Sequence, residues 1–169
     1  MTITVVASSL VKTAFNFTET QSGTIRSENE SITASRAYTY GTGIFEIDGA
    51  IKNTGVLPSG GSVILDLTAM TNTAFGITST VAFSGIKTVT VYNTSTIQGR
   101  DINIRATGSN AFTELFNGGS GNLLIKPYSS FSYNDPYKLT VSATQKNISL
   151  FDVSGSGATY EICVLGNLT

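Results

Sequence analysis

From residue 44 onward the chain consists of short runs in which apolar and polar side chains alternate, and this periodicity constrains the fold more than any other feature. The run at 87–93, KTVTVYN, alternates valine with hydroxyl-bearing residues. The run at 101–106, DINIRA, alternates isoleucine with polar residues. A strand that alternates in this way has one buried face and one solvated face. Gly, Ser and Asn separate the runs, as is typical of turns.

About ten to twelve such runs follow one another at roughly 8–14-residue spacing, and no stretch shows the pattern of an amphipathic helix. The run at 44–53 is expected to place Phe45, Ile47 and Gly49 on one face of a strand. FTELF, at 112–116, is ambiguous between a strand and a helical turn. The spacing predicts an all-β fold, namely a jelly-roll-like β-sandwich of short antiparallel strands.

The first forty residues differ from the rest. The opening stretch TITVVASSLV lacks the basic start of a secretory signal, so we interpret it as a first strand and expect synthesis in the cytoplasm. Residues 18–36 hold three of the six glutamates and two of the four arginines, Arg26 and Arg36. This polarity predicts a long surface loop or an extended arm that orders against a partner. We therefore expect an N-terminal strand with a polar arm or long loop (1–40) and a β-sandwich domain (41–169).

The composition excludes most catalytic chemistry. The 169 residues include no His, no Trp and one Cys, and ten basic residues are balanced by eleven acidic ones. Without histidine there is no Ser-His-Asp triad and no imidazole metal ligand, and a single cysteine forms neither an intrachain disulfide nor a thiolate cluster. The balanced charge does not favour nucleic acid, and no apolar window is long enough to span a membrane. The sequence predicts a protein that is not an enzyme and that binds no cofactor and no metal.

The remaining reactive groups have structural interpretations. Glu46 and Asp48 lie two residues apart, which allows a shared cation, but a solvated strand face is the simpler expectation. Asp135, in the turn sequence NDP, is expected to cap backbone amides. Cys163 has no base nearby in the sequence and is expected to pack rather than react. A hydrolase would need two carboxylates in one cleft.

Aromatic residues gather in one stretch of the second half of the chain. If exposed, they would anchor a protein interface or stack on sugar rings; if buried, they would pack in the core and at a corner. Together with the two arginines of the polar stretch they form the candidate interface set: Tyr128, Phe131, Tyr133, Tyr137, Arg26 and Arg36.

Three stretches, FSGIKTVTVYNTS, LLIKPYSSFSYNDP and NISLFDVSGSGATYEICVLGN, resemble small β-sandwich virion proteins of tailed bacteriophages. The resemblance covers about residues 44–167 and transfers no functional residue. It implies a capsid decoration or cement protein that is made in the host cytoplasm and forms a homo-oligomer, such as a trimer. Such a protein binds the major capsid protein lattice at the virion surface.

A second function class remains open on the sequence. A compact β domain with exposed tyrosines and asparagines is also suited to be a carbohydrate-binding or receptor-binding adhesive module, such as a fibre or tail component, with a host glycan as its partner. The two classes can be distinguished by experiment: an adhesive module should bind glycans, whereas a decoration protein should bind assembled heads.

Overall fold

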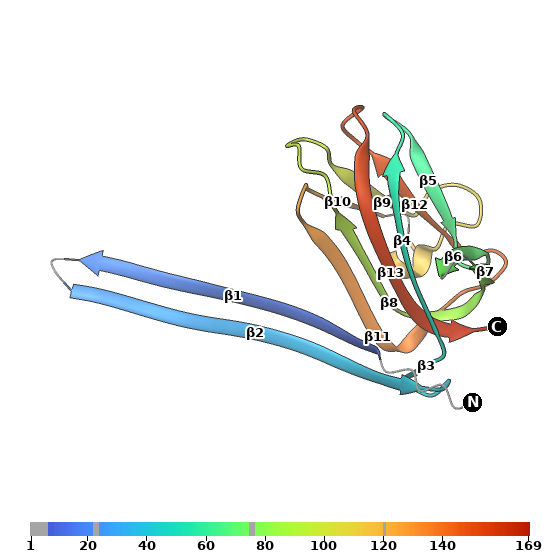
Figure 1. Ribbon diagram of the computed structural model, residues 1–169, viewed down its shortest axis with the longest axis horizontal. Coiled ribbons are helices and arrows are strands. Elements are labelled where there is room, and N and C mark those ends of the chain that lie inside the picture. Colours follow the sequence, from blue (N-terminus) through green and yellow to red (C-terminus); the bar gives the residue numbers. More distant parts are fainter. Residues whose placement is uncertain (1–6, 22–23, 75–76, 120) are drawn as a thin grey trace.

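The computed structural model describes the backbone in four ranges, 7–21, 24–74, 77–119 and 121–169. Side chains are described for Tyr38, 41–71, 78, 80–119 and 121–169. Within these ranges the strands form a two-layered body, from which a long two-stranded ribbon projects (Figure 1).

The body contains two four-stranded antiparallel sheets. The strands of the first sheet lie in the order β11 (Ser130–Thr140), β8 (Phe83–Asn93), β13 (Ala158–Leu168), β4 (Gly49–Leu57). Those of the second sheet lie in the order β10 (Asn122–Ile125), β9 (Ile102–Arg105), β12 (Asn147–Asp152), β5 (Ser62–Asp66).

The strands of the body pair in a nested order. β4 pairs with β13, β5 with β12, β8 with β11 and β9 with β10. The first strand of the body therefore lies beside the last, the second beside the second-last, and so on inward to the middle of the chain. Eight strands wrapped in this way into two facing sheets form a jelly roll. The predicted all-β sandwich is confirmed, and the strand order gives its topology.

Alternate residues of the two sheets face each other and form the core. Val89 and Val91 of β8 and Ile102 and Ile104 of β9 are fully buried, as their alternation predicted. Burying each such aliphatic side chain contributes roughly 1.5–3 kcal/mol. The same cluster of buried side chains includes Leu57, Phe83, Phe112, Ile148, Leu150, Ile162 and Val164.

The N-terminal part of the chain forms an antiparallel ribbon of β1 (Ala7–Gln21) and β2 (Thr24–Tyr40). Figure 1 shows that most of the ribbon lies away from the body. Residues 18–36 contribute to it, and residues 1–6, the start of the expected first strand, lie outside the described part of the chain.

Shorter elements complete the fold. β3 (Glu46–Ile47) pairs in parallel with the end of β2. A hairpin of β6 (Met70–Ala74) and β7 (Ile77–Val81) lies between β5 and β8 in the chain. The ambiguous run FTELF contains the 3-10 turn η1 (Thr113–Phe116).

Two local expectations are wrong. The run at 44–53 is interrupted at Asp48, so Phe45 is 55% exposed while Ile47 and Gly49 are buried. In β8 the face expected to be solvated is covered at Thr88, which is buried because Tyr38 of the N-terminal chain packs against it. β11 continues through the turn sequence NDP, and its register with β8 shifts between Asn134 and Leu139.

Candidate functional site

The base of the ribbon is attached to the outer face of the first sheet. Tyr38, near the end of β2, is fully buried and packs with Ile47 and Leu165. Its hydroxyl accepts a hydrogen bond from Thr88 Oγ1 of β8 at 3.3 Å. A tyrosine with a buried ring and a satisfied hydroxyl fixes both position and orientation. The ribbon therefore leaves the body at a set point.

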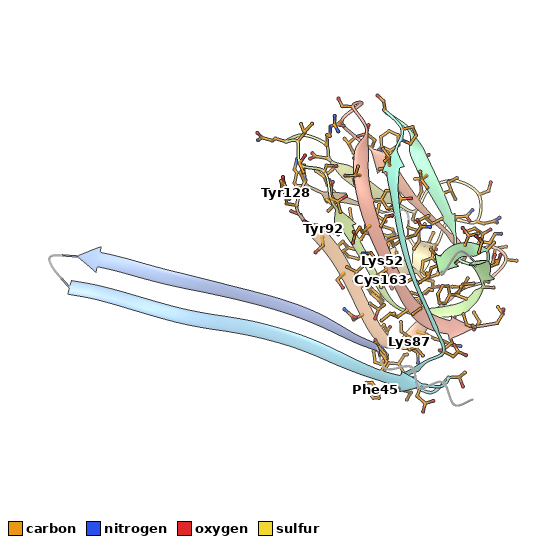
Figure 2. All side chains as sticks on the ribbon, viewed as in Figure 1. Phe45, Lys52, Lys87, Tyr92, Tyr128 and Cys163 are labelled. Carbon is orange, nitrogen blue, oxygen red and sulfur yellow. The ribbon has the colours of Figure 1, made fainter. Side chains whose placement is uncertain are left out.

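A buried lysine holds the loop that follows the ribbon. Lys87 of β8 is 1% exposed, and its Nζ donates to the carbonyl oxygens of Gly43, of Ile44 at 3.1 Å and of Glu46 at 2.6 Å. Burial, together with the charge of nearby Lys138, lowers the pKa of Lys87 below its ordinary value. Three carbonyl acceptors satisfy the three donors of an ammonium group, which makes its burial tolerable. Figure 2 shows Lys87 and Phe45 at the base of the ribbon.

The last residues of the chain bind the same loop from the other side. Asn167 Nδ2 donates to the carbonyl oxygens of Gly41 at 3.1 Å and Glu46 at 3.3 Å. Asp48 Oδ1 accepts a hydrogen bond from the backbone N–H of Leu168 at 2.7 Å. We call residues 38–48 the root. Its contacts with β8 and β13 make the root part of the body rather than a free linker.

Beyond the root, the ribbon is a long two-stranded sheet. Its register runs without interruption from the Ala7–Tyr38 pair to the Gln21–Thr24 pair. A two-stranded sheet is marginally stable in water, and its two edges leave backbone donors and acceptors unpaired. Such a ribbon gains stability when another surface covers it or extends an edge.

The outer face of the first sheet carries hydroxyl groups and an ion pair. Thr90 Oγ1 and Ser132 Oγ share a hydrogen bond of 2.9 Å across β8 and β11. Lys52 and Glu161 form an exposed ion pair of 2.9 Å. Cys163 lies between these pairs, and burial raises the pKa of its thiol, which therefore stays protonated at neutral pH. Figure 2 shows Lys52 and Cys163 on this part of the body.

At the opposite end of the body, Asp152 organises two loops. It is 1% exposed and accepts hydrogen bonds from the backbone N–H groups of Gly60, Gly157 and Ser154 and from Ser154 Oγ at 2.6 Å. Burial alone raises the pKa of this carboxyl, but the hydrogen bonds outweigh burial and lower it to about 2. The β4–β5 and β12–β13 loops are thereby fixed to each other.

Asn93, fully buried at the end of β8, organises the other two loops at this end. Its Nδ2 donates to the carbonyl oxygens of Arg100 at 2.7 Å and Ile125 at 3.0 Å, and its Oδ1 accepts from Ser95 N–H at 3.0 Å. A hollow of about 480 Å³ lies between the β8–β9 and β10–β11 loops. It is lined by Thr96, Gln98, Gly99, Asp101, Lys126, Pro127 and Tyr128.

The candidate interface residues are not gathered in one place. Tyr128 and Tyr137 are 63% and 73% exposed, but they lie on either side of residues 130–134, the segment of β11 that pairs in regular register with β8. Phe131 and Tyr133 lie between them and pack against the core. The side chains of the two arginines, Arg26 and Arg36, lie outside those described, and their backbone belongs to β2.

The candidate carboxylates have local roles. Glu46 Oε2 accepts the N–H of Gly43 at 2.8 Å, and Asp48 binds the C-terminal strand as described above. Asp135 Oδ1 caps the N–H of Tyr137 at 2.8 Å, as expected. Among the described residues no three His, Cys, Asp or Glu side chains are close enough to hold a metal ion. No helix in the described part of the chain has the length and apolar character to cross a membrane.

Sequence reasoning missed Lys87, Asp152 and Asn93. A signal existed for Lys87, because it is a charged residue inside the otherwise apolar and hydroxyl-bearing strand GIKTVTV. The other two residues end strands β12 and β8, where polar residues are ordinary. Nothing in the local pattern distinguishes them from solvated turn residues.

Comparisons with known proteins add little. No family model matches the chain, and no curated protein matches it. The chain is similar in structure to the crystal structure of the Yersinia pseudotuberculosis-derived mitogen (YPM), with 13% identity and a TM-score of 0.37. The alignment covers 70% of this chain and 86% of that one. The jelly-roll assignment rests on the strand order alone.

Proposed function

We propose that this protein is a non-enzymatic assembly protein that attaches to a larger protein array through its N-terminal ribbon. The observation that carries the proposal is a long ribbon that projects from a firmly held root and lies mostly away from the body. The form suggested by the sequence resemblance is a capsid decoration or cement protein on the head of a tailed bacteriophage, acting as a homo-oligomer at the virion surface.

The geometry of the ribbon supports this proposal. Each new backbone hydrogen bond along an unpaired edge contributes about 0.5–1.5 kcal/mol net. The ribbon sequence also contains apolar residues, Phe15, Phe17 and Ile32, whose burial against another surface adds to this. Because Tyr38 and Lys87 hold the root, little orientational freedom is lost when the ribbon docks. A prepositioned ribbon therefore binds more tightly than a flexible tail of the same sequence.

The action on the shell follows from mass action. A protein that binds assembled subunits but not free ones shifts the equilibrium toward the assembled shell. When many copies bind one shell, the effective concentration of each binding segment is high, so contacts that are weak individually give a stable attachment. The proposed role makes and breaks no covalent bond, so it does not require histidine or any other catalytic side chain.

A register-preserving deletion tests the proposal. Removing residues 10–19 together with 26–35 deletes ten residues from each strand, joins Ser9 to Thr20 and Ile25 to Arg36, and keeps the remaining pairs aligned. The turn and the root stay intact. The full chain and this short-ribbon variant are each mixed with empty heads of the virus that encodes the protein, and the heads are sedimented.

We expect the full chain to co-sediment with the heads and the short-ribbon variant to bind at least about tenfold more weakly. Urea unfolding of the body should be unchanged, because the deleted pairs lie away from it (Figure 1). Ile64→Ala, an exposed change on β5 of the second sheet, is the matched control and should bind like the natural chain. Failure of the full chain to bind heads, or equal binding by the short-ribbon variant, contradicts the proposal.

A further inference from the structure

We propose that the hollow beside Tyr128 is a binding site for a neutral saccharide. This inference goes beyond the assembly role, because the hollow lies at the loop end of the body, whereas the ribbon leaves from the root (Figures 1 and 2). It rests on the strained position of one tyrosine, on the way the loops hold that residue, and on the balanced polarity of the lining.

Tyr128 occupies a backbone position that favours glycine. Ser129 N–H donates to the Lys126 carbonyl oxygen at 3.0 Å, which closes a turn with Pro127 second and Tyr128 third. The φ of Tyr128 is +61°, in the left-handed region that Gly or Asn adopts at least cost. A bulky residue at positive φ is an outlier, and such strain gathers at functional sites. Local stability does not explain a tyrosine here.

The turn holds the ring in a fixed place. The N–H of Tyr128 donates to the carbonyl oxygen of Asn93 at 3.0 Å, and the N–H of Asn93 donates to the carbonyl oxygen of Ser129 at 3.0 Å. Asn93 itself is fully buried and bound through its side chain to both flanking loops. The ring, 63% exposed, is therefore presented from a rigid support, which is the arrangement expected of a preorganised binding site.

The lining selects the class of ligand. Lys126 Nζ binds Asp101 Oδ2 at 2.5 Å, so the two charges in the wall compensate each other and leave no field for a phosphate or a carboxylate. Thr96 and Gln98 add a hydroxyl and an amide, which donate and accept hydrogen bonds. A sugar ring matches this set, because its C–H face stacks on an aromatic ring while its hydroxyl groups bond to polar side chains. The volume of about 480 Å³ is within the range of small-molecule sites.

One polar atom of the wall has capacity for a further bond. Asp101 Oδ1 is buried and has no hydrogen-bond partner among the described residues, and the same is true of Arg100 Nε in the preceding residue. Buried polar groups are normally paired, so Asp101 Oδ1 can accept one further hydrogen bond and Arg100 Nε can donate one. Gly99 has a φ of +86°, and no atom lies within 4 Å of the position that a Cβ would occupy there, so the hollow is open beside this residue.

The experiment compares the full chain with Tyr128→Gly and Tyr128→Phe. Each is applied to a printed panel of neutral and anionic oligosaccharides, and the best neutral oligosaccharide is titrated by NMR at up to millimolar concentration. We expect the natural chain and Tyr128→Phe to bind neutral oligosaccharides and Tyr128→Gly to bind at least about tenfold more weakly. Tyr137→Ala, which removes another highly exposed tyrosine, should bind normally.

The glycine variant separates binding from folding. Because glycine fits positive φ better than tyrosine, the melting temperature of Tyr128→Gly should equal or exceed that of the natural chain. Absence of saccharide binding by the natural chain, or unchanged binding by Tyr128→Gly, overturns the proposal. So does a loss of head binding or of self-association by Tyr128→Gly without any saccharide binding, which assigns the ring to a protein contact. The short-ribbon variant should keep its saccharide binding, so the two proposals fail independently.

Discussion

Replacing Lys87 with methionine tests whether the root is held as the structure indicates. Methionine keeps most of the volume of the side chain but has no donor, so the carbonyl groups of Gly43, Ile44 and Glu46 lose their shared partner. Gly43 and Ile44 are exposed, and water can rehydrate their carbonyl groups, whereas Glu46 is half-buried. The change therefore removes the equivalent of one to two charge-assisted hydrogen bonds, each worth about 1.5–3 kcal/mol.

Part of this loss of stability is offset, because burying the uncharged methionine avoids the cost of removing the lysine charge from water. We expect Lys87→Met to lower the free energy of unfolding by about 2–3 kcal/mol, measured by urea unfolding with far-UV circular dichroism at pH 7. Hydrogen exchange should show faster exchange of amides in the 41–47 loop before the strands of the body are affected. Binding to heads should weaken as well, because the ribbon is no longer prepositioned.

The matched control is Lys52→Met. Lys52 is an exposed lysine whose ion pair with Glu161 contributes at most about 1 kcal/mol.

The pH dependence of stability gives a second test of the role of Lys87. The pKa of Lys87 is lowered from its ordinary 10.5, so between the two values the unfolded chain binds more protons than the folded one, and stability rises with pH. Lys87→Met should lack this rise. If Lys87→Met is no more destabilising than Lys52→Met, and the amides of the 41–47 loop exchange as in the natural chain, then Lys87 does not hold the root.

Two further predictions concern the body. The pKa of Asp152 is lowered from 3.8 to about 2, so its contribution of about 2 kcal/mol is complete above pH 4 and is lost as the pH falls toward 2; acid unfolding of Asp152→Asn should lack this component, and identical acid curves would contradict the loop bonds described. A Cβ on Gly166 would overlap the carbonyl oxygen of Gly85, so Gly166→Ala should destabilise by several kcal/mol, about 3 or more. Gly99→Ala, which meets no atom within 4 Å, should lose only about 1 kcal/mol from backbone strain, and equal urea midpoints for the two variants would refute the packing argument.

The periodicity of the sequence predicts the sheets because burial acts on each strand separately. Ile102 and Ile104 alternate with polar neighbours, so their inward orientation follows from local pattern alone. Strand partners depend on contacts between segments far apart in the chain, and alternation does not encode them. The register shift after Asn134 is equally hidden, and it separates Tyr137 from the inward-facing Tyr133.

The polar contacts that hold the root and the loops could not be predicted from the sequence for a related reason. Lys87 binds carbonyl oxygens more than forty residues earlier, and a backbone carbonyl has no signature in the sequence. Tyr128 was identified as a candidate, but the feature that distinguishes it from the other candidate aromatic residues is its positive φ. Pro127 before it is a local indication of a turn, and a turn alone does not say whether the following ring is exposed.

The nested strand order has a practical consequence. Because the last strand of the body lies beside the first, the C-terminal residue ends close to the root, where Thr169 N–H donates to the carbonyl oxygen of Ala82. The molecule thus has two poles, with the C-terminus and the root at one and the four loops at the other (Figure 1). A peptide displayed for engineering purposes belongs at the loop pole, which faces away from the root, whereas a tag fused to the C-terminus would crowd the pole through which we propose that the protein attaches.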